Sequence, residues 1–177
     1  PDAWQLWAWR ASTLVALQRP KQALEAARTA RKLNPKSVDA WTQEANALRK
    51  LEQLEEALEA CDQALKIDTD HWQAWMLKGE VLYGLSHSHE LSDREKAREI
   101  AKDAVDCFDR ALALKPDCPR VLAMKGERLA LLGRSDEALK CFDEAIKLAP
   151  DDSIVWYTKG LALFRLQRYK EAVPAFE

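Results

Sequence analysis

The sequence repeats itself with a spacing of 34 residues, and this feature restricts the possible fold more than any other. A bulky residue returns at Trp7, Trp41, Trp75, Leu122 and Trp156. Four positions later a small residue returns at Ala11, Ala45, Gly79, Gly126 and Gly160. Each step is 34 residues except the third, which is 47. A period of this length indicates one supersecondary unit that is repeated and stacked along the chain.

Each unit is expected to be helical. Apolar residues recur three and four positions apart, as at Ala138, Phe142, Ala145 and Leu148, which gives a helix one apolar face. Ala supplies 28 of the 177 residues and Leu 25, whereas Ile and Val together supply only 11. Strong helix formers therefore greatly outnumber β-branched residues, and the sequence predicts an all-α protein.

These columns resemble the tetratricopeptide repeat family, whose helix–turn–helix unit carries Trp, Gly or Ala, Ala, Phe and Pro at the same places. The resemblance covers essentially the whole chain and implies an all-α solenoid of about five repeats, wound into a right-handed superhelix. It divides a single array, 1–177, into units at 4–37, 38–71, 72–118, 119–152 and, in part, 153–177. Because the last unit stops inside a second helix, we expect the chain to be part of a longer one.

One column departs from the family pattern. The residue before the small column, usually Leu in the family, is charged in every unit: Arg10, Glu44, Lys78, Lys125 and Lys159. Because charged side chains are rarely buried, we expect this column to be solvated.

The third unit is 13 residues longer than the others, and the extra residues fall between its two helices. Ser92 to Glu95 matches a capping box, and helical spacing then continues to Leu114. We predict a second helix from Asp93 to Leu114, roughly 33 Å long, whose first two turns project beyond its neighbours. His87 and His89 would lie in an exposed loop before it, where no third ligand converges to complete a metal site.

Composition and motifs exclude several function classes. The 27 basic and 29 acidic residues nearly cancel, so there is no basic field for nucleic acid or for an anionic membrane. No apolar run is long enough to span a bilayer. The four cysteines lack metal-ligand spacing and favour a reducing, cytoplasmic compartment. No nucleophile elbow, phosphate loop or carboxylate pair predicts an enzyme, and we expect no cofactor.

In the tetratricopeptide repeat family, the first helix of each unit lines a concave groove where ligand peptides lie. Carried over column by column, the resemblance implies a peptide-binding face at Trp9, Asn46, Met76, Leu77, Glu80, Met124, Glu127, Tyr157 and Thr158. Leu77, Met124 and Tyr157 would be apolar anchors for the peptide. Asn46, Glu80 and Glu127 would fix its register, because amides and carboxylates hydrogen-bond a peptide backbone.

The sequence therefore predicts a scaffold that binds a peptide segment of a partner protein in its concave groove. Two alternatives stay open. The array could be a spacer or self-assembly element that uses the insertion near 92–101 and its open ends, although the insertion could also be merely tolerated. It could also select substrates for an enzyme carried elsewhere on a longer chain.

Overall fold

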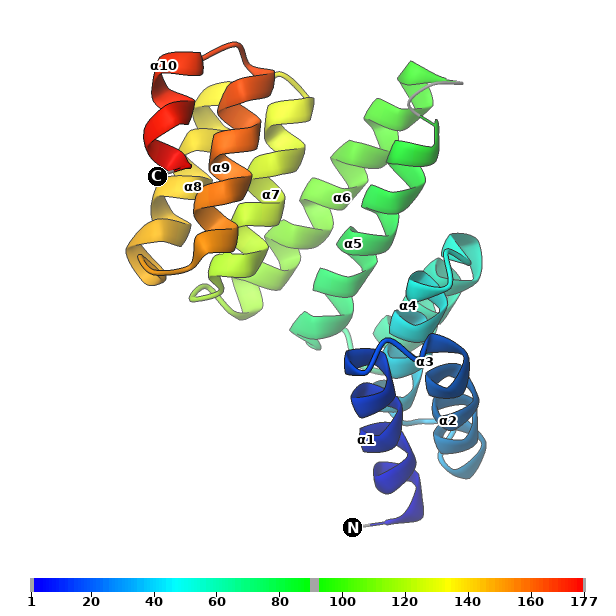
Figure 1. The fold of residues 1–177 in the computed structure, drawn as a ribbon. Coiled ribbons are helices and arrows are strands. Elements are labelled where there is room, and N and C mark those ends of the chain that lie inside the picture. The colour runs from blue at the N-terminus through cyan, green and yellow to red at the C-terminus, as the bar shows by residue number, and fades with distance from the viewer. Residues whose placement is uncertain (1, 90–92, 177) are drawn as a thin grey trace.

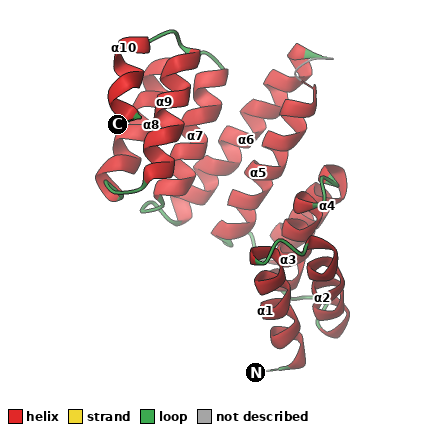
Figure 2. Ribbon diagram, in the orientation of Figure 1, coloured by secondary structure: helices red, strands yellow, loops and turns green. Residues whose placement is uncertain are grey.

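The computed structural model describes residues 2–89 and 93–176, and within them the chain is an array of antiparallel helix pairs (Figures 1 and 2). These residues form ten α-helices, one short 3-10 helix and no strand. The helices are α1 (Ala3–Ala16), α2 (Pro20–Leu33), α3 (Val38–Lys50), α4 (Leu54–Ile67), α5 (Trp72–His89), α6 (Arg94–Leu114), α7 (Pro119–Leu131), α8 (Ser135–Leu148), α9 (Ser153–Arg165) and α10 (Tyr169–Ala172), followed by the 3-10 helix Val173–Ala175. The predicted all-α fold is confirmed.

Consecutive helices pack as hairpins, from α1 with α2 to α9 with α10, which we number one to five in the described part of the chain. The second helix of each hairpin packs on the first helix of the next, and first helices also contact one another, as α1 does α3 and α3 does α5. Figure 1 shows the hairpins following one another from the N-terminus at the bottom to α10 at the upper left. The core is therefore a strip of buried side chains that runs along the array, as expected of a helical-repeat solenoid.

The small column sets how closely the two helices of a hairpin approach. A Cβ atom built on Gly79 would lie 2.5 Å from Cε1 of Phe108, and one built on Gly160 would lie 2.5 Å from Cε1 of Phe176. Gly126 is opposed by the Phe142 ring in the same way, at 3.0 Å. A phenylalanine thus occupies the space that a side chain on the first helix would need, from the second helix in hairpins three and four and from just after the 3-10 helix in hairpin five.

The insertion lengthens both helices of the third hairpin, and the predicted exposed loop around His87 and His89 is wrong. Helix α5 has 18 residues and α6 has 21, against 13 or 14 in α1 to α4 and α7 to α9. The regular hairpins turn at a residue with positive φ, such as Gln18 (56°) or Gly133 (78°). The equivalent residue of the third hairpin is Ser86, which is helical and buried instead of forming a turn. Helix α5 therefore continues to His89.

The extended part of α6 does not project alone, because the extension of α5 runs beside it and Ala97 and Ala101 are buried. The helix begins as predicted within one residue, at Arg94, and the Asp93 carboxylate accepts a hydrogen bond from the Lys96 amide at 3.0 Å. The cap is thus Asp93, one position after the start of the predicted capping box. Ser92, the predicted cap, lies outside the described residues.

The prediction that the charged column is solvated is confirmed for Arg10, which is exposed, and is wrong for the other four residues. Lys78, Lys125 and Lys159 reach back to an aspartate on the second helix of the preceding hairpin, Asp62, Asp109 and Asp143, at 2.7, 2.5 and 2.8 Å. Glu44 is buried and meets Arg28 at 3.2 Å and Arg31 at 2.6 Å on α2. Each interface between these hairpins therefore carries an ion pair, which sequence columns taken one at a time do not reveal.

The tryptophan column ties hairpins two, three and five to the turn that precedes each of them. The indole Nε1 of Trp41, Trp75 and Trp156 donates to a carbonyl oxygen six residues earlier, that of Pro35, Thr69 or Pro150, at 3.0, 2.7 and 2.8 Å. The acceptor in each case is a backbone carbonyl oxygen. The bond therefore forms at Thr69 just as it does at Pro35 and Pro150, the residues at the equivalent position of the other two units.

Candidate functional site

Two hollows adjoin on the face formed by the first helices. The smaller, of about 310 Å³, lies between α1 and α3 and includes Trp9. The larger, of about 360 Å³, extends across α3 and α5 to Arg120 on α7. Gln43 lines both hollows, so together they form one groove, which we call the α1–α5 groove.

Five of the predicted peptide-binding residues lie in this groove. Trp9 is 60% exposed at its amino-terminal end. Asn46, Met76, Leu77 and Glu80 line the larger hollow. Because Leu77 and Glu80 are buried and Met76 and Asn46 are half-buried, they form its floor and lower walls.

The other four predicted residues, on α7 and α9, do not line the groove. Met124 packs against the core, and the Thr158 hydroxyl donates to the Ile154 carbonyl at 2.7 Å in its own helix. Glu127 pairs with Arg128 at 2.9 Å and with Arg165 at 3.4 Å. Tyr157 is exposed and lines a separate hollow near the C-terminal end, where its ring meets that of Phe176 edge-on.

Glu80 is the electrostatic centre of the groove. Its carboxylate, 4% exposed, accepts from Arg120 at 2.6 Å and lies 3.1 Å from the Arg49 guanidinium. A carboxylate buried this deeply needs such partners, because the loss of its hydration is otherwise uncompensated. The two arginines, from α3 and α7, therefore join three hairpins through Glu80. Both of its oxygens are engaged, and the groove presents guanidinium groups around it.

Two further residues of the groove, of which sequence reasoning missed Arg49, carry buried hydrogen-bonding atoms that lack a partner in the described part of the chain. The side-chain oxygen Oε1 of Gln43 and the Nε of Arg49 are buried and have no hydrogen-bond partner among the residues described. The Arg49 Nη2 donates to Oδ1 of Asn46 at 3.1 Å, which fixes both side chains. The signal for Arg49 was weak, since its column reads Val15, Arg49, Tyr83, Ala130 and Phe164.

The cysteines and the possible metal ligands were the remaining candidates for chemistry in the part of the chain described. Cys61, Cys107 and Cys141 are free and buried, and burial raises the pKa of Cys61 and Cys107 to about 12, so both are protonated thiols at neutral pH. No group of three His, Cys, Asp or Glu side chains is placed to hold a metal ion in the part of the chain described. Among the described helices, none is both long and apolar enough to cross a membrane.

Comparison with protein families gives a match to the tetratricopeptide repeat over residues 9–70, 42–86 and 124–177. These ranges cover most of the chain. Comparison with curated protein sequences gives no match.

Solved structures of the same architecture are similar over nearly the whole chain. TTC0263, a thermophilic TPR protein in Thermus thermophilus, has 24% identity and a TM-score of 0.87, with 98% of this chain and 88% of that one covered. MamA from Desulfovibrio magneticus RS-1 has 19% identity and a TM-score of 0.76, covering 99% and 92%. YrrB, a TPR protein with an unusual peptide-binding site, has 21% identity and a TM-score of 0.67, covering 96% and 80%. At these identities the likeness supports the fold alone.

Proposed function

The chain belongs to the tetratricopeptide repeat family, whose members are protein-interaction scaffolds, and on this premise we propose that it binds an extended peptide of a partner protein in the α1–α5 groove. No chemistry on the peptide is involved. Recognition rests on the shape of the groove and on the hydrogen bonds that its floor and walls offer.

The observation that carries this proposal is the pair of buried atoms that no described residue satisfies, Gln43 Oε1 and Arg49 Nε. One is an acceptor and the other a donor, and a peptide backbone supplies the complementary N–H and C=O groups. Leaving a buried polar atom unsatisfied costs about 1–3 kcal/mol. Both atoms are covered by neighbouring side chains, so a peptide reaches them only when those side chains shift. A peptide that then satisfies both atoms recovers that cost, and we expect these two residues to determine affinity.

The lining also indicates what the peptide carries. Met76 and Leu77 offer an apolar floor, and Met adapts its shape to different side chains. Arg49, Lys50 and Arg120 lie around that floor. We expect an apolar anchor residue beside an acidic one. The peptide-binding site of YrrB, a protein of the same architecture, supports the proposal by analogy only.

The test is selection of a random displayed-peptide library on the purified chain, followed by affinity measurement on two matched variants. Gln43 and Thr158 occupy the same column, and only Gln43 lines the α1–α5 groove. We expect Gln43→Leu to weaken the selected peptide about tenfold, or about 1.4 kcal/mol, and Thr158→Val to leave it unchanged.

The opposite ranking of these variants, with helicity unchanged, would refute the proposed site and favour one on α7 and α9, around Met124, Glu127, Tyr157 and Thr158. Failure of the folded chain to enrich any peptide would refute groove binding. Self-association, the remaining prediction for this chain, would then be measured by light scattering over a range of concentrations.

A further inference from the structure

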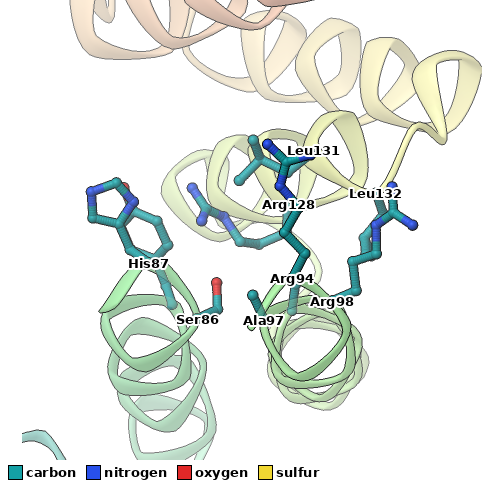
Figure 3. Close-up of a pocket in the computed structure, with 10 residues that line it drawn as sticks. Ser86, His87, Arg94, Ala97, Arg98, Arg128, Leu131 and Leu132 are labelled. Carbon is teal, nitrogen blue, oxygen red and sulfur yellow. The ribbon is translucent and has the colours of Figure 1, made fainter. Parts of the chain in front are cut away.

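A third hollow, of about 290 Å³, lies away from the α1–α5 groove, where the third hairpin meets α7 (Figure 3). It is lined from the extended end of α5, the first two turns of α6 and the last turn of α7. The insertion creates it, because the regular hairpins turn back before they could form such walls.

Arg128 closes one side of this hollow and breaks the pattern of its column. The column reads Thr13, Ala47, Val81, Arg128 and Ala162, so a guanidinium replaces a small residue in one unit. The residue is only 1% exposed, which makes it the largest side chain buried this completely among those described. A buried charge is costly and is seldom retained without a partner.

The contacts of Arg128 compensate its charge only in part. Its guanidinium carbon lies 3.4 Å from the centre of the Tyr83 ring, a cation–π contact. Nη2 is 2.9 Å from the Glu127 carboxylate, yet neither Nη1 nor Nη2 makes a hydrogen bond with any described residue. The guanidinium nitrogens Nη1 and Nη2 are therefore buried in the wall of the hollow without a hydrogen-bond partner in the described part of the chain.

Two more arginines line the same hollow. Arg94 and Arg98 are one turn apart on α6, and Figure 3 shows both side chains rising toward the Leu131–Leu132 end of α7. Both are exposed, and neither forms an ion pair with a described residue. Among the lining residues described there is no acidic side chain. With one of three guanidinium charges offset by Glu127, two positive charges remain.

From this arrangement we propose that the hollow binds a phosphate group, either free or as a monoester. A phosphate monoester carries a charge of about −1.5 to −2 at neutral pH, which matches the excess of two positive charges. Phosphate oxygens accept paired hydrogen bonds from a planar guanidinium fork, and three guanidinium groups from two helices line this hollow. The site is independent of the α1–α5 groove, so its test does not depend on peptide binding there.

The test is calorimetric titration of the full chain with inorganic phosphate and, separately, with a short phosphoserine peptide and its unphosphorylated form. We expect the phosphate-bearing ligands to bind and the unphosphorylated peptide not to bind. Tighter binding of the phosphopeptide would identify a protein-borne phosphate as the source. Equal binding would identify free phosphate. Absence of binding by both at millimolar concentration would overturn the proposal.

Variants test the site itself. The double variant Arg94→Gln with Arg98→Gln changes exposed residues and should weaken phosphate binding at least about tenfold. The matched control is Arg110→Gln, an exposed arginine on the same helix outside the hollow, which should bind as the unmodified chain does. If Arg110→Gln weakens binding as much as the double variant does, the effect is general charge and the proposal fails.

Arg128→Val, which restores the small residue of the column, gives a second readout. Phosphate should raise the unfolding temperature of the unmodified chain and of Arg110→Gln, but not that of Arg128→Val, since a ligand stabilises only the folded form that binds it. An equal rise in all three would show that phosphate acts elsewhere.

Discussion

The first two hairpins and the last three fill the space between their two paired segments differently: two small residues share it in the former, and one large residue fills it in the latter. In hairpins three to five a glycine on the first helix faces a phenylalanine that comes later in the hairpin, as Gly126 faces Phe142. In hairpins one and two the same columns hold Ala11 with Ala27, and Ala45 with Cys61, all fully buried. The helices pack in both ways, which teaches that the interface requires a complementary fit rather than particular residues.

The ion pairs between hairpins also differ along the chain, because the acidic and basic residues exchange sides. At the interface of hairpins one and two the first helix carries the acid, Glu44, and the second carries Arg28 and Arg31. At the later interfaces the first helix carries a lysine and the second an aspartate, as in Lys159 with Asp143. The ion pair forms whichever of the two helices carries the acidic residue, but the acidic side chains differ in how deeply they are buried. The Glu44 side chain is 6% exposed, whereas Asp143 is 57% exposed.

The largest effect is expected from removing the volume of a phenylalanine. Phe142 is fully buried, so Phe142→Ala leaves a cavity and should lower the free energy of unfolding by about 3–5 kcal/mol. Its counterpart Cys61→Ala removes a single atom and should cost about 1 kcal/mol. Urea denaturation of both variants measures the difference. Equal losses in free energy of unfolding would contradict the conclusion that these two hairpins fill the space between their helices in different ways.

The next effect comes from adding volume where there is none to spare. Gly79→Ala places a Cβ 2.5 Å from the Phe108 ring and should cost about 1–3 kcal/mol, despite the better helix propensity of Ala. Phe108→Cys in the same chain converts hairpin three to the Ala–Cys pair of hairpin two. We expect the loss in free energy of unfolding of the double variant to be smaller than the sum of the losses of the two single variants. A double-mutant cycle with no coupling would refute the comparison.

Repetition explains how much of the fold was predictable. Five copies of each column, such as Trp41 and Gly79 with their equivalents, average out local exceptions, so the helix type and stacking followed from sequence. The ion-pair partners across an interface between hairpins could not be predicted from the sequence. Lys78 and Asp62, for example, lie in different columns and become neighbours only once the hairpins stack. The polar segment around His87 looked like a loop, although Leu85 and Ser86 are buried and extend α5.

The site was less predictable than the fold for the same reason. The family resemblance placed Asn46, Met76 and Leu77 on the first-helix face, and they line the α1–α5 groove. Arg49 could not be selected, since its role depends on Glu80 from the next hairpin and on Arg120 from the one after. Columns describe a residue's place in its own unit, whereas the groove is made between units.

A smaller effect should separate the two kinds of ion pair. Glu44→Gln leaves Arg28 and Arg31 without the buried carboxylate and should cost about 1–3 kcal/mol. Asp143→Asn at an exposed pair should cost at most about 1 kcal/mol. Thermal unfolding of the two variants at the same ionic strength makes the comparison. A larger loss of stability for Asp143→Asn than for Glu44→Gln would show that the burial of the acidic side chain does not determine how much each ion pair contributes.

The smallest effect is a difference at alkaline pH. Burial alone would lower the pKa of Lys78, but the hydrogen bond and negative charge of Asp62 outweigh it, so the pKa is raised. The stability that this pair contributes is therefore complete below the pKa of an unfolded lysine, about 10.4, and is lost as the pH rises through the higher folded pKa. Arginine keeps its charge throughout this range.

Lys78→Arg should match the unmodified chain at pH 8 and exceed its stability by up to about 1 kcal/mol above pH 11. Lys140→Arg, at an exposed site with no ion pair to a described residue, is the control and should follow the unmodified chain at every pH. The interface of hairpins one and two has arginines in place of lysine, so it should not contribute to this alkaline loss. If Lys140→Arg gains as much stability above pH 11 as Lys78→Arg does, the alkaline loss of stability reflects the overall charge of the chain. The lysine–aspartate interfaces would then differ from the glutamate–arginine interface only in burial.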